Sequence, residues 1–234
     1  MFNSTHWSLI LAAGMEQHPR RNEGWEHLAQ EYWYPLYVFA RRSGYRPDAA
    51  ADLTQGFFEE LLRSERISRA DPARGRFRSF LLTSFKNHLR MERRAMAAQK
   101  RGGNASSISL DAQAAEERYL IEPVNESNPE ELFERRWVFE ILERALDRLI
   151  AEFSEGSRAG LFARLQSSLM GDRAGGSYAE IAREFTMTEG AVKAAVHRLR
   201  QRFRSLLREE IAGTVSSSSE IEDELRYIAQ VVSR

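Results

Sequence analysis

The sequence predicts an all-α protein of two small helical domains joined by a flexible linker, the second domain containing a helix-turn-helix. Three observations predict this architecture. Apolar residues recur at steps of three and four in nearly every periodic segment, which is the spacing of an amphipathic helix. No stretch alternates apolar and polar residues as a half-buried strand does. A polar stretch over residues 102–129 separates two such helical sets.

Composition narrows the class of protein. The chain has 234 residues, of which 42% are hydrophobic, enough for a packed core. It contains no cysteine, which excludes disulfides and thiolate zinc sites. No apolar run approaches the length of a membrane span, and residues 3–7 do not begin like a signal peptide. We therefore expect a soluble cytoplasmic protein.

The helical patterns and the polar stretch between them divide the chain into five segments. They are an N-terminal extension (1–24), a first domain (25–101), the linker (102–129), a second domain (130–210) and an amphipathic C-terminal extension (211–234). Fully extended, a linker of that length would span on the order of 90 Å, so the two domains could sit well apart on a partner.

The first domain begins with a helical pattern from about Trp25 to Ser43, in which Pro35 predicts a kink or a division. The apolar positions of this pattern are Trp25, Leu28, Tyr32, Leu36 and Phe39. A second helix is expected to start at Arg46-Pro47-Asp48, because proline is favoured in the first helical turn. Its apolar face consists of Leu53, Phe57 and Leu61.

The third helix, expected from about Arg76 to Gln99, has two stripes. Its apolar stripe consists of Phe77, Leu81, Phe85 and Leu89. Lys86, Arg90 and Arg94 form a cationic stripe that is offset by one residue, roughly 100° around the helix axis. The pattern predicts one face in the core and an adjacent face that offers cations at about one-turn intervals.

The second helical set follows the linker, in which residues 110–120 are a candidate for a short helix. It begins near Glu130. The apolar positions of its first helix are Phe133, Trp137, Ile141 and Leu149, and those of a shorter second helix are Leu161, Phe162, Leu165 and Leu169. A glycine-rich loop is then expected over residues 171–176.

Residues 177–204, SYAEIAREFTMTEGAVKAAVHRLRQRFR, have the form of a helix-turn-helix. Ser177 and Glu180 predict a capping box at the first helix, and Thr188 predicts the N-cap of the second. Thr186 stands in the turn, where such motifs often have glycine. The second helix has an apolar stripe of Val192, Val196, Leu199 and Phe203, and its other face carries Glu189, Lys193, His197, Arg198 and Arg200. A recognition helix needs this division, because its first turns reach base edges while flanking cations hold phosphates. An ordinary helical hairpin is the alternative.

Charge is grouped along a chain that is neutral overall, with 34 basic and 34 acidic residues. Basic residues dominate residues 63–101, acidic residues dominate 111–147, and a second basic stretch covers 193–208. Two basic blocks separated by an acidic one indicate two phosphate-facing surfaces. For either block alone, a solvated helix face is the alternative.

Three segments resemble the extracytoplasmic-function (ECF) sigma factors of bacterial RNA polymerase, and they occur in the same order. Residues 178–204 resemble region four, the promoter-upstream-binding domain. The segment DAAADLTQGFFEELLRS (48–64) resembles the helix of region two that docks on the clamp of core polymerase. The segment GRFRSFLLTSFKNHLRMERRAMAAQKRGG (75–103) resembles the regions that open and read the minus-ten element. The resemblance covers roughly residues 25–210 and implies a promoter-recognition subunit that is not an enzyme.

Carried over by position, the resemblance implies three groups of site residues. The contact with core polymerase would involve Asp52, Leu53, Gln55 and Phe58, with packing in the core as the equal alternative for Leu53. Promoter DNA near the minus-ten element would face Lys86, Asn87, Arg90, Arg93 and Arg94. The minus-thirty-five element would face Thr188, Glu189, Lys193, His197, Arg198 and Arg200. Many family members have an aspartate at the position of Met91, where this chain has Met91 followed by Glu92. No catalytic residue, metal or cofactor is expected.

The expected partners are core RNA polymerase and promoter DNA. An anti-sigma factor or other regulatory protein is a possible third partner, and no membrane partner is expected. A stand-alone helix-turn-helix transcription regulator is the main rival, but it leaves residues 25–101 unexplained. A metal-dependent hydrolase is disfavoured, because the five histidines are scattered and form no HExxH pair. A helical adaptor would show no salt-dependent DNA binding. The amphipathic helix expected from Glu220 to Val232 either docks on the chain's own domains or serves regulation, by autoinhibition or through a partner.

Overall fold

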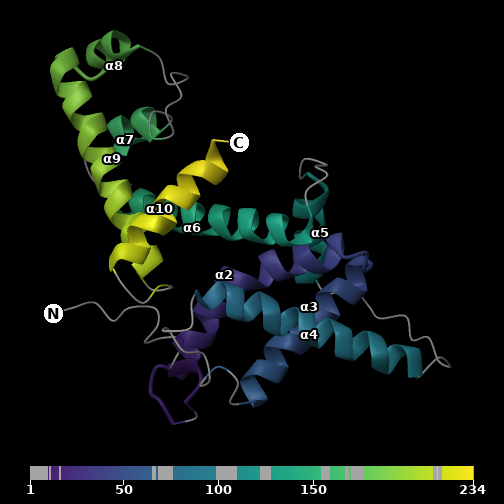
Figure 1. Ribbon diagram of the computed structural model, residues 1–234. Helices are drawn as coiled ribbons and strands as arrows, with labels where there is room; N and C mark the ends of the chain where they lie inside the picture. Colours follow the sequence, from purple (N-terminus) through teal and green to yellow (C-terminus); the bar gives the residue numbers. More distant parts are fainter. Residues whose placement is uncertain are drawn as a thin grey trace. The chain divides into compact units, whose positions relative to one another are not determined.

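The computed structural model is all-helical over the residues that it describes, which confirms the all-α part of the prediction. It describes residues 10, 12–15, 17–64, 67, 76–98, 110–121, 128–153, 159–166, 169, 177–212, 215 and 218–233, and no strand occurs among them. The helices are α2 (Arg21–Arg42), α3 (Pro47–Arg63), α4 (Phe77–Ala98), α5 (Leu110–Leu120), α6 (Pro129–Phe153), α7 (Ala159–Leu165), α8 (Tyr178–Glu184), α9 (Glu189–Ala212) and α10 (Ser218–Val232) (Figure 1). The loop expected over 171–176 lies outside the described residues. No helix in the described ranges is long and apolar enough to cross a membrane.

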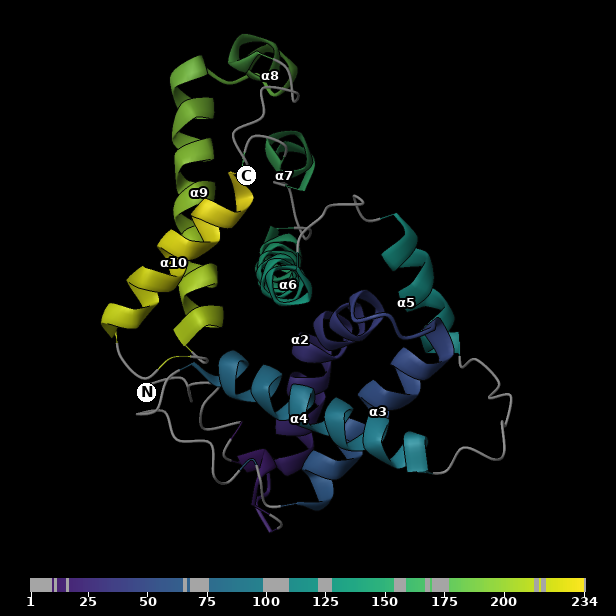
Figure 2. The same cartoon turned by 45° about the vertical axis from the view of Figure 1, so that its right-hand side comes forward.

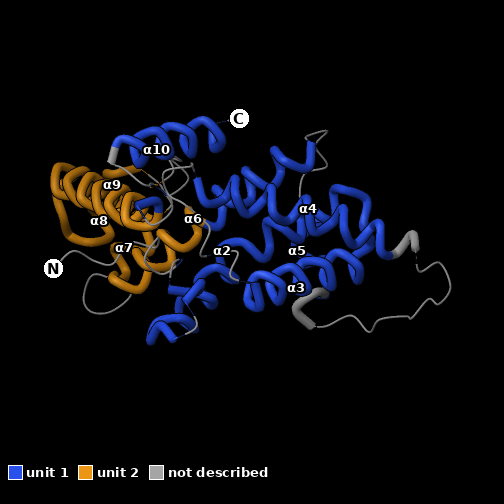
Figure 3. Tube along the Cα trace, turned by 60° about the horizontal axis from the view of Figure 1, so that its bottom comes forward, with its two compact units in different colours: residues 1–140, 211–234 blue, residues 141–210 orange. Residues whose placement is uncertain are grey.

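The chain forms two compact units, which Figure 3 colours separately. Unit 1 consists of residues 1–140 and 211–234, and unit 2 consists of residues 141–210. Both crossings between the units fall inside helices, since α6 leaves unit 1 after Glu140 and α9 re-enters it after Glu210. These boundaries differ from the division expected at residue 130, because the first turns of α6 and the whole of α10 pack within unit 1.

The core of unit 1 is rich in aromatic residues, contributed by α2, α3 and α4. These three helices lie close together in Figure 2. The Phe85 ring of α4 meets Phe57 of α3 edge to face, with ring centroids 5.0 Å apart, and Phe39 of α2 at 6.1 Å. Such ring pairs each contribute about 0.5–1.5 kcal/mol beyond the area that they bury. The apolar stripe predicted for α4 is confirmed, since all four of its residues are buried.

Helix α2 contains Pro35, where the sequence predicted either a kink or a division. The helix is not divided there but runs uninterrupted from Arg21 to Arg42 with Pro35 inside it. Proline removes one backbone hydrogen bond and crowds the preceding turn. Pro35 and the five residues that follow it are all buried, and we attribute the unbroken helix to this packing.

The predicted linker contains α5, which packs on α2 and α3 in unit 1. Glu116 of α5 accepts hydrogen bonds from the Tyr37 hydroxyl at 2.5 Å and from two guanidinium nitrogens of Arg41 at 2.8 and 2.7 Å. The Arg41 guanidinium also lies over the Tyr119 ring, 4.9 Å from its centroid. The middle of the linker is therefore a docked helix.

Helix α6 begins with three favourable features in succession. Asn128 caps it, because the Asn128 Oδ1 accepts the Glu131 backbone N–H at 2.8 Å. Pro129 occupies the first helical position, and Glu130 and Glu131 place negative charge in the first turn. Further along, the Trp137 indole N–H donates to Glu31 of α2 at 2.9 Å, so this end of α6 packs on α2.

Unit 2 is held together by pairs between α6 and α9. Arg148 of α6 pairs with Glu209 at 2.5 Å and Glu210 at 2.7 Å. Arg202 of α9 pairs with Glu152 of α6 at 2.5 Å. Phe153 at the end of α6 stacks on Phe162 of α7, with centroids 5.4 Å apart. These contacts fix the base from which the first turns of α9 project.

Candidate nucleic-acid interface

The helix pair α8 and α9 begins at two side-chain caps, both as predicted. The Ser177 Oγ accepts the Glu180 backbone N–H at 3.2 Å, while the Glu180 carboxylate accepts the Ser177 N–H at 2.9 Å, which completes a capping box. The Thr188 Oγ1 accepts the Ala191 N–H at 3.1 Å at the start of α9. The starts of both helices are thus defined by local sequence.

The turn between α8 and α9 contains a strained residue. Thr186 has a φ of +53°, in the left-handed region that a β-branched side chain rarely adopts. Its backbone N–H donates to Arg183 O at 3.4 Å, and the Met187 N–H donates to Ala182 O at 2.8 Å. This bonding pattern is the Schellman motif, whose left-handed position is usually glycine. The turn therefore has the usual geometry, although threonine disfavours the left-handed conformation that this position requires.

Helix α9 buries one face and exposes the other. The predicted apolar stripe of Val192, Val196, Leu199 and Phe203 is buried. Every residue predicted to face the minus-thirty-five element is exposed, namely Thr188, Glu189, Lys193, His197, Arg198 and Arg200. Among the described residues no carboxylate pairs with Lys193, His197 or Arg198. Arg202, one turn after Arg198, is by contrast paired with Glu152 at 2.5 Å.

The exposed face of α4 offers a second cationic surface, in unit 1. Asn87, Arg90, Arg93 and Arg94 are all exposed. The Arg90 Nη1 donates to Asn87 Oδ1 at 3.3 Å, and the Arg93 guanidinium lies 5.6 Å from the Tyr45 ring centroid. Lys86 is the exception among the five predicted residues, because its ammonium pairs with Glu130 of α6 at 2.7 Å.

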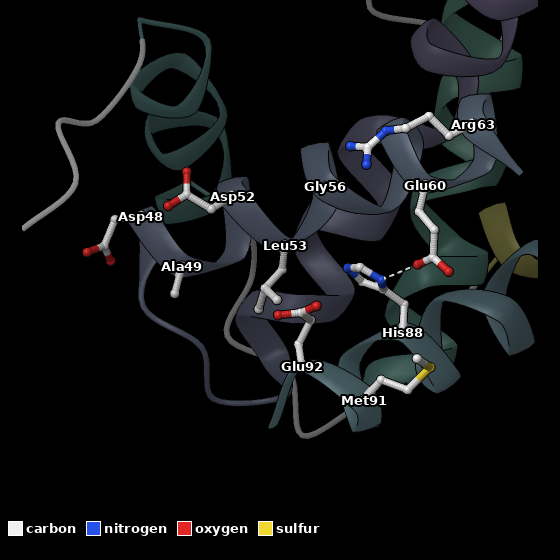
Figure 4. A pocket seen from close by; sticks show the side chains of 10 residues that line it. All are labelled: Asp48, Ala49, Asp52, Leu53, Gly56, Glu60, Arg63, His88, Met91 and Glu92. Atoms are coloured by element: carbon white, nitrogen blue, oxygen red, sulfur yellow. Dashed lines mark hydrogen bonds and ion pairs between the residues drawn. The ribbon is translucent and has the colours of Figure 1, made fainter. Parts of the chain in front are cut away.

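The predicted polymerase-contact residues on α3 differ in exposure. Asp52 and Gln55 are exposed and Phe58 is half-buried, but Leu53 is only 5% exposed and packs in the core. Asp52 and Leu53 belong to a groove of about 630 Å³ between α3 and α4 (Figure 4). In that view the Leu53 side chain points from α3 toward Glu92 of α4.

The groove has polar residues that sequence reasoning did not single out. The His88 Nδ1 lies 2.7 Å from the Glu60 Oε2, and both residues line the groove with Arg63 and Glu92. Their sequence signal is weak: His88 precedes Leu89 and Glu60 precedes Leu61, so each polar residue stands at the edge of an apolar stripe. In the described ranges no group of three or more His, Asp or Glu side chains could hold a metal ion.

The exposed residues among those predicted therefore lie on three helices, α3, α4 and α9 with its N-cap, and of the exposed ones on α3 only Asp52 lines the groove. No protein-family model, curated protein or solved structure matches this chain.

Proposed function

We propose that this protein is a sigma factor of the extracytoplasmic-function type, which binds core RNA polymerase and directs promoter recognition, strand opening and initiation. The observation that carries the proposal is the exposed face of α9, where Lys193, His197 and Arg198 project from a doubly capped helix pair. Helix-turn-helix domains use such a face in the major groove of DNA. A helical hairpin used only for packing has no need of it.

The second cationic surface favours a promoter-binding subunit over a stand-alone regulator. The exposed residues of α4 belong to unit 1, whereas those of α9 belong to unit 2. Two DNA-facing helices in two units suit a protein that contacts two promoter elements. Phosphate contacts from arginine and lysine supply affinity that falls with salt, and side chains near Thr188 supply the choice of sequence.

The groove beside α3 is the proposed surface for core polymerase. Its exposed carboxylates include Asp52, and Gln55 and Phe58 lie on the same helix. Leu53 takes the role of a packing residue that supports this surface, because it is buried.

Two assays with purified components test the proposal. The full chain should co-purify with core RNA polymerase, and the resulting complex should initiate transcription at defined sites on a promoter library. A stand-alone regulator would bind DNA but leave polymerase alone. Failure to bind polymerase, together with unchanged start sites, would sink the proposal.

A further inference from the structure

Acidic residues of α6 cover part of the cationic stripe of α4 within unit 1. Glu130 and Glu134 are one turn apart on α6 and contact cations two turns apart on α4. The Glu130 Oε1 lies 2.7 Å from the Lys86 Nζ, and the Glu134 Oε2 lies 2.7 Å from the Arg78 Nε. The acidic block found between the two basic blocks thus supplies counter-charges to the first of them.

The contact at Arg78 is a buried anchor. Arg78 is 2% exposed and also pairs with Glu224 of α10, which is 0% exposed, at 2.7 Å. The guanidinium lies over the Trp137 ring at 4.2 Å and near the Tyr227 ring at 5.4 Å. Removing one partner of a buried ion pair leaves an uncompensated charge, which is strongly unfavourable. This anchor therefore holds the start of α6, together with α10, against α4.

The contact at Lys86 is of a different kind. The Lys86 and Glu130 side chains are 36% and 44% exposed, so water and salt screen their attraction. The hydrogen bond from Lys86 lowers the pKa of the Glu130 carboxyl, with a further contribution from the helix backbone, so Glu130 is ionised near neutral pH. Another anion can therefore easily replace the Glu130 carboxylate at Lys86. Lys86 is also the first residue of the stripe that continues through Arg90 and Arg94.

We infer that Glu130 is a built-in competitor for DNA phosphate at Lys86, held in place by the Arg78 anchor. The inference rests on the proposed function, since it assumes that α4 faces DNA. In the free chain the Glu130 carboxylate occupies the position of a phosphate and repels an approaching one. DNA must displace this side chain while the buried anchor stays intact. The masking lowers the affinity for DNA only modestly, because DNA binding breaks only one screened ion pair, that of Lys86 and Glu130.

Charge-neutral variants of α6 test the masking in the full-length chain. Glu130→Gln should tighten binding of a labelled promoter-length DNA duplex at low salt by about threefold, within the range expected for an exposed pair. Glu131→Gln is the matched control. Glu131 is the next residue and carries the same charge, but it bonds Asn128 at the cap, where glutamine is also accepted. It should leave the affinity nearly unchanged.

A double-mutant cycle then assigns the gain to Lys86. In a Lys86→Gln background, Glu130→Gln should bring no further gain in affinity, because the masked cation is gone. Equal tightening by the Glu130 and Glu131 variants would mean a general charge effect and would overturn the masking. So would the absence of DNA binding by every variant. Co-purification with polymerase and transcription by the unaltered chain report separately on the proposed function, so the two failures are distinguishable.

Discussion

At the scale of single residues, Thr186 is the position where the chain departs from its own motif. A left-handed conformation costs a β-branched residue about 1–2 kcal/mol, whereas glycine adopts it freely but loses more chain entropy on folding. Thr186→Gly should therefore raise the free energy of unfolding of unit 2 by about 0.5–1 kcal/mol, measured by urea titration with circular dichroism.

The same substitution at an ordinary helical site provides the control for Thr186. Thr83 is exposed in the interior of α4, and Thr83→Gly should lower stability by roughly 0.3 kcal/mol. If both variants were destabilised alike, strain at Thr186 would not be the explanation.

The contribution of Arg78 to stability depends on the buried groups that surround it. Arg78→Ala would remove one of the two arginines that pair with the buried Glu224, because Arg76 also lies 2.5 Å from its carboxylate, and we expect a loss of about 1–3 kcal/mol in the stability of unit 1. Arg226→Ala on α10, which removes an exposed pair with Asp223, should cost less than about 0.5 kcal/mol. Thermal melts of both variants make the comparison. A small loss at Arg78 would mean that α10 is not anchored there.

The burial of core residues could be predicted from the sequence, whereas their tertiary contacts could not. The burial of Phe85 and Phe57 follows from periodicity, because a helix repeats every 3.6 residues whatever it packs against. The pairing of Lys86 with Glu130 does not, since the two residues are 44 positions apart and meet only through tertiary packing. For Leu53, the structure favours the packing alternative that the sequence left open.

At the scale of elements, α9 carries the sharpest functional prediction. Arg198→Ala combined with Arg200→Ala should weaken promoter binding, because a lost base contact costs about 1–3 kcal/mol and a lost phosphate contact lowers the salt dependence. Binding to core polymerase should be retained. Both quantities can be measured by fluorescence anisotropy on the purified components.

Arg202→Ala is the control on the same helix. It removes one positive charge, but the Arg202 guanidinium is already paired with Glu152, so promoter affinity should change much less than in the double variant. If polymerase binding and promoter binding fell together in the Arg198 and Arg200 variant, the assignment of this face to DNA would be wrong.

Helix α5 should respond to acid. Burial disfavours the charged form of Glu116, but hydrogen bonds from Arg41 and Tyr37 outweigh it and hold the pKa of the carboxyl below its ordinary value of 4.5. Because the pKa is lowered in the folded state, this carboxylate stabilises docking above pH 4.5. That stability is lost as the pH falls through the lowered pKa. The protection of residues 110–120 against hydrogen exchange, relative to the intrinsic rate at each pH, should therefore fall on acidification.

Replacing the titrating group tests the acid response of α5. Glu116→Gln should weaken docking already at neutral pH and remove much of the acid dependence of the protection in residues 110–120. An unaltered acid response in this variant would assign the effect to another group.

The elements themselves were largely predictable. The start of α3 at Pro47 and the caps at Ser177 and Thr188 follow from local hydrogen bonding and backbone preference, which act within a few residues. The continuity of α2 through Pro35 was not predictable in this way. It depends on burial by residues from other helices, and no local pattern reports that.

At the scale of the whole molecule, the predicted all-helical class is confirmed, while the compact units differ from the expected segments. Periodicity located the helices but not their partners. Trp137 shows why: its apolar character fits either unit, and its hydrogen bond to Glu31 is what ties the start of α6 to α2. Likewise, the C-terminal helix docks in unit 1 through Glu224, so deleting it would remove a core charge partner together with any regulatory role.

The placement of both unit crossings inside α6 and α9 bears on how the molecule can be dissected. A fragment cut at residue 130 would take Phe133 and Trp137 away from the core that buries them. The isolated fragment would then expose a hydrophobic aromatic surface to solvent and tend to aggregate on expression. A fragment of residues 141–210 keeps the core residues of unit 2 together, so spectroscopic studies of that unit should begin from it.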